Sequence, residues 1–231
     1  MTQHDPAHPR PTNETVPAGA QDPTAGRTAH SLPGFGAGIA DPGPLGLAGF
    51  AGTTLFLSAV NAGLLPDKVE TGVLGLAIFY GGIAQLLAGL WEFAKGNTFG
   101  ATAFVSYGAF WLSFWYLITD GVPAMAAAKA APDDINHAVG TYLLVWAIFT
   151  TYMFIASLRT TAAIAAVFLF LAATFIFLCI GAYSATTGIT KVGGYLGLIT
   201  AALAFYGSFA VVTNATFKKT VLPVVPLARA I

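Results

Sequence analysis

Long apolar segments alternate with short polar connections along this chain. Six segments each hold about 20 predominantly apolar residues, which is the length that a helix needs to cross the hydrocarbon core of a bilayer. Because the connections between them are short, the segments favour one bundle over separate domains. The pattern predicts an all-α integral membrane protein, a bundle of six transmembrane helices. The expected spans are 45–65, 73–93, 99–119, 139–158, 162–182 and 192–213.

The two ends of the chain differ from this apolar region. Residues 1–40 are rich in Pro, Thr, Ala, Gly and His, and they contain neither a sustained apolar stretch nor the apolar core of a secretory signal. Such a segment buries too little surface to offset its ordering entropy. We expect a disordered cytoplasmic tail at 1–40, a six-helix transmembrane domain at 41–217 and a C-terminal tail at 218–231.

Lysine and arginine are unevenly distributed between the two sides that the alternating spans define. The side that carries both termini has more of these residues than the opposite side. Cytoplasmic loops of membrane proteins carry an excess of Lys and Arg, so we predict cytoplasmic termini in a multi-pass protein of the plasma (cell inner) membrane. The cations on the terminal side are Arg27, Lys95, Arg159, Lys218, Lys219 and Arg229, and those on the opposite side are Lys68, Lys129 and Lys191.

The composition agrees with a membrane protein and excludes several functions. Apolar residues make up 56% of the chain and charged residues 9%, with a mean hydropathy of +0.72, whereas about a quarter of a soluble domain is charged. A net charge of zero offers no basic face to nucleic acid. Because no ionisable residue lies near the centre of a predicted span, we expect no haem, no metal, no other cofactor and no enzymatic activity.

Two acidic residues lie at the ends of predicted spans. Glu92 closes the second span and Asp120 follows the third. A charge at a span end is normally solvated at the membrane interface. We therefore expect Glu92 to be an interfacial residue near Lys95 rather than a proton carrier.

Polar residues also stand where two helices are expected to start. Asp41 precedes the prolines of the first span, and a side chain of this type caps a helix well. Asn97 follows Gly96 directly before the third span. This pattern is typical of a turn and an N-cap, and a ligand at the mouth of a pore is the alternative.

Two polar residues within spans are candidates for the interior of the bundle. Gln85 shares a helix face with Gly82 and Gly89, so it either packs tightly or lines a pore. Tyr107 lies near the middle of the third span, away from the interface where Tyr normally gathers. A buried phenol needs a partner, so a neighbouring hydroxyl-bearing face indicates a polar lining. That face carries Thr102, Ser106, Ala109 and Ser113.

A neutral interior rich in aromatic and small residues suits a small solute that is weakly charged or can bind a proton. A carboxylate near neutral pH is mostly an anion, and burying an unpaired anion is very costly. Its passage requires either a hydrated path with hydrogen-bond donors or the company of a proton. The residues alone leave both mechanisms open.

Several ordered motifs carry a family resemblance. Residues 41–47 resemble the Asn-Pro-Ala-Pro-Leu-Gly-Leu signature of the acetate uptake transporter family, which includes the bacterial succinate–acetate permeases and fungal acetate and ammonia transporter relatives. Residues 78–85, 96–100, 103–111 and 220–223 resemble that family in order and spacing. The signature residues shared here are Pro42, Pro44, Leu45, Gly46 and Leu47.

The resemblance implies a function and an assembly. It implies a homo-hexamer in membrane lipid, in which each protomer passes acetate and, in some members, succinate. It also implies a narrow point formed by Phe50, Tyr107 and Leu171, and our hypothesis for polar contacts is Thr53, Gln85, Asn97 and Ser106. Asp41 replaces the usual Asn. It either caps the helix or faces the anion, and in the second case uptake is slower or more dependent on protons.

The sequence therefore predicts a transporter or channel for acetate and similar small monocarboxylates, with proton-coupled uptake and selective passive conduction both open. One alternative is an ammonia or ammonium exporter, for which aromatic faces or carboxylates would bind the cation. Another is a membrane sensor or scaffold that transports nothing. No nucleic-acid partner is expected.

Overall fold

The computed structural model describes residues 38–227, so most of the predicted tail at 1–40 and the end of the C-terminal tail lie outside the described residues. Within 38–227, six helical segments are long and apolar enough to cross a membrane. This confirms the all-α bundle that the hydrophobic pattern predicts. The segments are Gly43–Asn61, Asp67–Ala94, Thr98–Ala127, Pro132–Ser157, Ala162–Tyr183 and Thr187–Phe217.

Four of the spans are single α-helices and two are composite. The single helices are α1 (Gly43–Asn61), α6 (Pro132–Ser157), α7 (Ala162–Tyr183) and α8 (Thr187–Phe217). The second span joins a 3₁₀ turn, η1 (Asp67–Val73), to α2 (Leu74–Ile78), a π turn η2 (Phe79–Ala84) and α3 (Gln85–Ala94). The third span joins α4 (Thr98–Tyr116) to the π turn η3 (Leu117–Gly121) and α5 (Val122–Ala127).

Several helices extend beyond the bounds predicted from hydropathy. The fourth helix begins at Pro132 rather than at 139, because proline fits a first helical turn and Asp133 and Asp134 are favourable at a helix N-terminus. The third span continues through Asp120 to Ala127. Hydropathy detects only the apolar part of a helix, whereas the backbone hydrogen bonds continue into the polar residues on either side.

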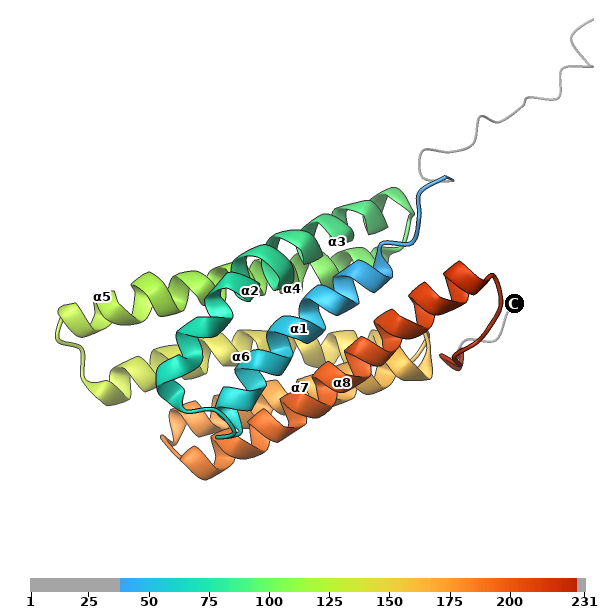
Figure 1. Ribbon diagram of the computed structural model, residues 1–231. Coiled ribbons are helices and arrows are strands. Elements are labelled where there is room, and N and C mark those ends of the chain that lie inside the picture. The colour runs from blue at the N-terminus through green and yellow to red at the C-terminus, as the bar shows by residue number, and fades with distance from the viewer. Residues whose placement is uncertain (1–37, 228–231) are drawn as a thin grey trace, which may run out of the picture. The chain divides into compact units, whose positions relative to one another are not determined.

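The helices run up and down through one bundle (Figure 1). In it α1 packs along α8, α8 along α7, α7 along α6, and α3 along α4. The start of α1 and the end of α8 lie at the same end of the bundle. We call this end the terminus side, and we call the end with the connection between α5 and α6 the far side. The shared side of the two ends agrees with the predicted topology, and its cytoplasmic location stays a prediction.

The signature residues 42–47 form the start of α1. Pro42 is the cap residue, and the Gly43 N–H donates to the Asp41 carboxylate at 3.0 Å, so Asp41 does support the helix start. A Cβ on Gly46 would lie 2.7 Å from the Phe104 ring on α4, and the Pro44 carbonyl accepts a bond from Ser208 on α8. The signature therefore fixes the start of α1 between α4 and α8.

The segment that follows α8 folds back over the terminus side. The Asn214 side chain, near the end of α8, binds the backbone of Val221 and Leu222. The Leu227 N–H then donates to the Thr160 carbonyl at 2.9 Å, in the connection between α6 and α7. The motif at 220–223 thus holds the chain beside this connection.

Candidate functional site

Two cavities reach into the bundle from its opposite ends. The terminus-side cavity has a volume of about 300 Å³, and the far-side cavity has a volume of about 190 Å³. Phe50 on α1 and Leu171 on α7 line both cavities. The two cavities therefore approach each other at these two side chains.

Tyr107 completes this narrow point from α4. It lines the terminus-side cavity, and the centroid of its ring lies 5.5 Å from that of Phe50. Phe50, Tyr107 and Leu171 are all buried. The three side chains come from three different spans, and we call them the narrowing. Further aromatic rings hold Tyr107 in place: those of Trp146, Phe149 and Phe168.

The polar end of Tyr107 points away from its own helix. Its hydroxyl lies 2.9 Å from the Thr150 hydroxyl on α6, and Thr150 is fully buried. A buried phenol requires such a partner. The sequence indicated a partner for this phenol and a polar lining beside it, and the structure supplies the partner hydroxyl from a different span.

Gln85 and Asn97 contribute amides to the terminus-side cavity. Gln85 is 1% exposed, and its Oε1 has no hydrogen-bond partner. Asn97 caps α4, because its Oδ1 accepts the Gly100 N–H at 3.1 Å, and its Nδ2 donates to the Glu92 carboxylate at 2.9 Å. Asn97 is therefore the helix cap that the pattern predicts, and it also lines the cavity.

Glu92 corrects a sequence-based expectation. We expected a solvated residue near Lys95, but Glu92 is 2% exposed and lines the terminus-side cavity. Lys95 instead binds Asp41, with Nζ 3.1 Å from the carboxylate oxygen. The expectation failed because the starts of α1 and α4 pack over the end of α3, and this arrangement cannot be seen along the sequence.

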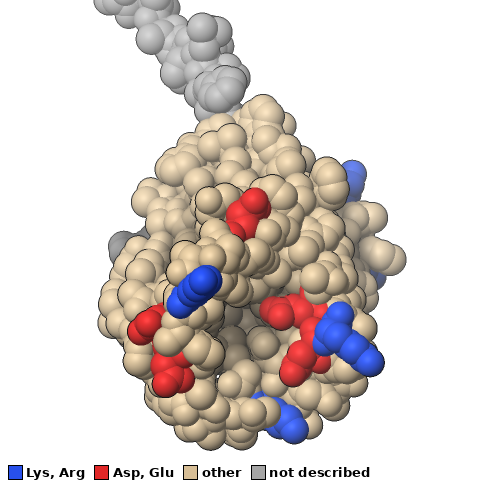
Figure 2. All heavy atoms as spheres, turned by 90° about the vertical axis from the view of Figure 1, so that its left-hand side faces the viewer, with Lys and Arg blue, Asp and Glu red and all other residues tan. Residues whose placement is uncertain are grey.

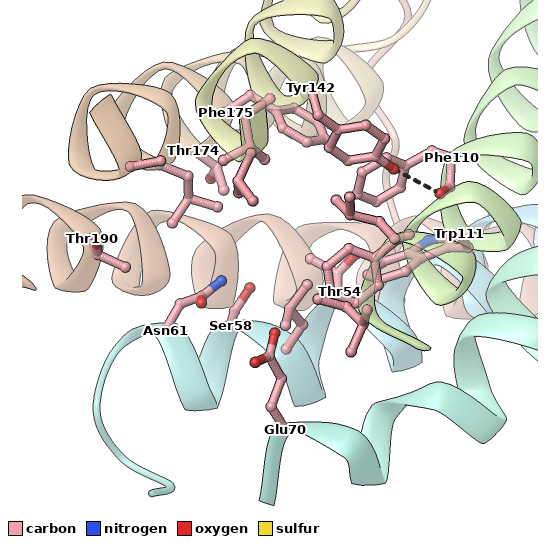
Figure 3. A pocket seen from close by; sticks show the side chains of 18 of the residues that line it. Thr54, Ser58, Asn61, Glu70, Phe110, Trp111, Tyr142, Thr174, Phe175 and Thr190 are labelled. Atoms are coloured by element: carbon pink, nitrogen blue, oxygen red, sulfur yellow. Dashed lines mark hydrogen bonds between the residues drawn. The ribbon is translucent and has the colours of Figure 1, made fainter. Parts of the chain in front are cut away.

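The far-side cavity is lined mostly by apolar side chains, with a few hydroxyl, amide and carboxyl groups among them (Figure 3). Ser58 and Asn61 on α1 face Glu70 on η1 across its opening. Thr54 also lines it, and its buried hydroxyl has no partner. Deeper in the cavity, the Tyr142 hydroxyl donates to the Phe110 carbonyl at 3.1 Å. Figure 2 shows this end of the molecule as a hollow face with both acidic and basic side chains around the hollow.

Neither cavity has a fixed positive charge in its lining. Among residues 38–227, no Lys or Arg lines either one. Carboxyl groups are present in each, with Glu70 on the far side and Asp41 and Glu92 on the terminus side. The arrangement suits a small solute whose charge is neutralised by dipoles or by a proton.

Comparison with known proteins gives the family. The model of the GPR1/FUN34/yaaH family matches residues 28–229, most of the chain. The chain belongs to this family. The resemblance noted in the sequence is thereby confirmed.

Individual members of the family carry transport names. The chain is 42% identical over 190 residues to ammonia transport outward protein 2 of Saccharomyces cerevisiae, covering 82% of this chain and 67% of that protein. It is 40% identical over 188 residues to the succinate-acetate/proton symporter SatP of Escherichia coli K12, covering 80% and 95%. A solved structure of the bacterial acetate channel SatP matches with a TM-score of 0.71 and 38% identity, covering 80% and 99%.

Some of the polar contact residues that we proposed from the sequence line a cavity in the structure, and others do not line either cavity as described. Gln85 and Asn97 line the terminus-side cavity. Within the described residues, Thr53 and Ser106 are absent from the lining of both cavities. The Thr53 hydroxyl donates to the Gly49 carbonyl at 2.9 Å within its own helix, which is a common use of Thr in membrane helices.

Other residues in or beside the cavities were missed by sequence reasoning. Asn61 and Glu70 lie at span ends, where polar residues read as loop punctuation. Thr150 is one of several Thr residues in the fourth span and has no distinctive neighbours in sequence. A comparison of the helix faces of the fourth span with the position of Tyr107 could have identified Thr150 as its partner.

Proposed function

We propose that this protein carries acetate and similar small monocarboxylates across the plasma membrane, each protomer through its own path. The observation that carries the proposal is the pair of cavities, which approach each other at Phe50, Leu171 and Tyr107. Relatives named as a succinate-acetate/proton symporter and as an acetate channel support it. The path runs from the far-side cavity through the narrowing to the terminus-side cavity.

The size of the cavities suits a small solute. A water molecule takes up about 30 Å³ of liquid, so the cavities, of about 190 and about 300 Å³, each have room for acetate with a few waters. The narrowing presents two aromatic rings and an aliphatic side chain. It therefore selects by width and by charge, and it admits a carboxylate best when a proton accompanies it.

The surroundings of the path fit the same proposal. Large apolar side chains such as Ile148 and Ile155 on α6 and Phe209 on α8 are exposed on the outside of the bundle, where lipid or neighbouring protomers cover them in a membrane protein. The homo-hexamer and the cytoplasmic location of both termini belong to the proposal as well. The excess of Lys and Arg on the terminus side supports this orientation.

The test is the uptake of labelled acetate by vesicles that contain the purified full chain, with and without a pH gradient. Protein-free vesicles are measured in parallel, because undissociated acetic acid crosses lipid by itself. We expect protein-dependent uptake that a pH gradient accelerates. Uptake equal to that of protein-free vesicles under both conditions would overturn the proposal.

Ammonium export is the second candidate, because one relative is named as an ammonia transport outward protein and because the described lining of the far-side cavity contains the carboxyl group of Glu70 and no Lys or Arg. Competition separates the candidates. Inhibition of acetate uptake by propionate but not by methylammonium supports the carboxylate, and the reverse supports ammonium. A chain that passes neither solute while residues 1–40 capture a partner protein would instead be a sensor or scaffold.

A further inference from the structure

Glu92 is a buried carboxyl group that the proposed path does not yet use. It stands in the last turns of α3 with 2% of its surface exposed. A Cβ on Gly100 would lie 3.0 Å from its carboxyl carbon, and a Cβ on Gly43 would lie 3.6 Å from its Oε1. The carboxyl group therefore lies between the starts of α1 and α4.

Some features around Glu92 favour its ionised form, and others favour its protonated form. Burial without a cation makes the ionised form costly. The Asn97 amide donates to the ionised form at 2.9 Å, and the starts of two helices favour negative charge. These opposing influences are typical of a carboxyl group that gains and loses a proton when its surroundings change.

The charged groups near Glu92 are on two elements. Asp41 precedes α1 and disfavours a second negative charge, and Lys95 follows α3 but is bound to Asp41 at 3.1 Å. The connection between α6 and α7 contributes only the neutral Thr160 and Thr161 to the cavity lining. Glu92 thus has no cation of its own among the described lining residues.

Glu92 lies on the proposed path. It lines the terminus-side cavity together with Tyr107 of the narrowing and with Gln85, whose buried Oε1 has no partner. Glu92 therefore lies within this cavity, on the terminus side of the narrowing.

We propose that Glu92 exchanges a proton with the carboxylate that passes through the terminus-side cavity. The inference rests on the proposed function and names the group that couples the proton to the solute. When the acid arrives through the narrowing, its O–H bond breaks and a new O–H bond forms on Glu92. The solute leaves as an anion, and Glu92 returns its proton to water at the terminus side. When transport runs in the opposite direction, Glu92 takes a proton from water at the terminus side and gives it to the entering carboxylate.

The test compares wild-type protein with Glu92→Gln as pH is raised. Gln has the same shape and keeps an oxygen for the Asn97 amide, so the variant retains the local contact. In transport from the terminus side to the far side, where Glu92 would supply the proton, Glu92→Gln passes only acid that is already protonated in solution, and this fraction falls about tenfold for each pH unit above the pKa. We expect its protein-dependent acetate flux to be within about twofold of wild type near pH 6 and about tenfold or more below it near pH 8.

Two further variants make the result specific. Asp120→Asn neutralises an exposed acid that lines neither cavity within the described residues, and it should follow wild type at every pH. Glu92→Asp keeps a titratable group and should recover part of the flux near pH 8.

The outcomes separate the inference from the function on which it rests. A ratio of wild-type flux to Glu92→Gln flux that stays constant with pH shows that Glu92 is only structural, and it overturns the inference while leaving the transport function intact. Wild-type flux equal to that of protein-free vesicles overturns the proposed function itself.

Discussion

The hydroxyl of Tyr107 on α4 lies 2.9 Å from the hydroxyl of Thr150 on α6, and both residues are buried. This contact ties the polar end of the phenol to α6, so the ring remains beside Phe50 at the narrowing. At the narrowing, Tyr107 therefore contributes the surface of its ring, because its hydroxyl is already bound to Thr150. Under the proposed function, this hydrogen bond would help to set the width and the polarity of the narrowing.

Removal of the Thr150 hydroxyl tests this relationship. Thr150→Val leaves the Tyr107 hydroxyl buried without a partner, which costs about 1–3 kcal/mol of the free energy of unfolding. Tyr107→Phe removes the other half of the pair. We expect the double variant to be less destabilised than the sum of the two single variants, measured by unfolding of the purified protein in mixed micelles. Additive costs would show that the two hydroxyls do not interact.

Close packing of α1 on the second span makes a prediction about glycine. A Cβ on Gly49 would lie 2.5 Å from the Tyr80 carbonyl oxygen in the π turn, so a methyl group there forces α1 and the second span apart. Gly49→Ala should destabilise the protein by about 1–3 kcal/mol. Gly75→Ala is the matched control, because no atom lies within 4 Å of its Cβ position. Equal unfolding midpoints for the two variants would contradict this packing.

The ion pair at the terminus side makes a prediction about the mouth of the path. Lys95 balances Asp41, which lines the cavity, so Lys95→Ala leaves an unbalanced negative charge in the way of an anion. The KM for acetate should rise in Lys95→Ala and return toward wild type in the double variant with Asp41→Asn. Stability should change little, by less than about 1 kcal/mol, because the pair is partly exposed.

Failure of the second substitution to restore KM would count against an electrostatic role for Asp41. That role is one of the two that the sequence left open for it. The other role, support of the helix start, is already visible in the bond from the Gly43 N–H.

The sequence predicted most of the fold, because hydropathy and helix length depend on local composition. It also identified Tyr107, since a phenol in the middle of a span is unusual, and Asn97, since a cap has a local pattern. Phe50 and Leu171 came from the family resemblance alone, because in composition they are ordinary core residues.

The remaining features depend on contacts between segments that are distant in the chain. Glu92 is buried by the starts of α1 and α4, and Thr150 meets Tyr107 from a separate span. Neither contact has a periodicity that a single sequence reveals. Thr53 is a different case, since it was proposed for a polar contact with the solute whereas its hydroxyl donates to the Gly49 carbonyl of its own helix.

The narrowing is the central claim, and the most direct measurement is the size selectivity of Phe50→Ala. Loss of this ring, which lines both cavities, would join them into one wider path. We predict that the flux of butyrate relative to acetate through purified protein in vesicles rises about tenfold, the discrimination that a methylene or two can provide in a narrow site. Phe217→Ala, at the exposed end of α8, should leave the ratio unchanged. A wild-type ratio in Phe50→Ala, with acetate flux intact, would contradict the account.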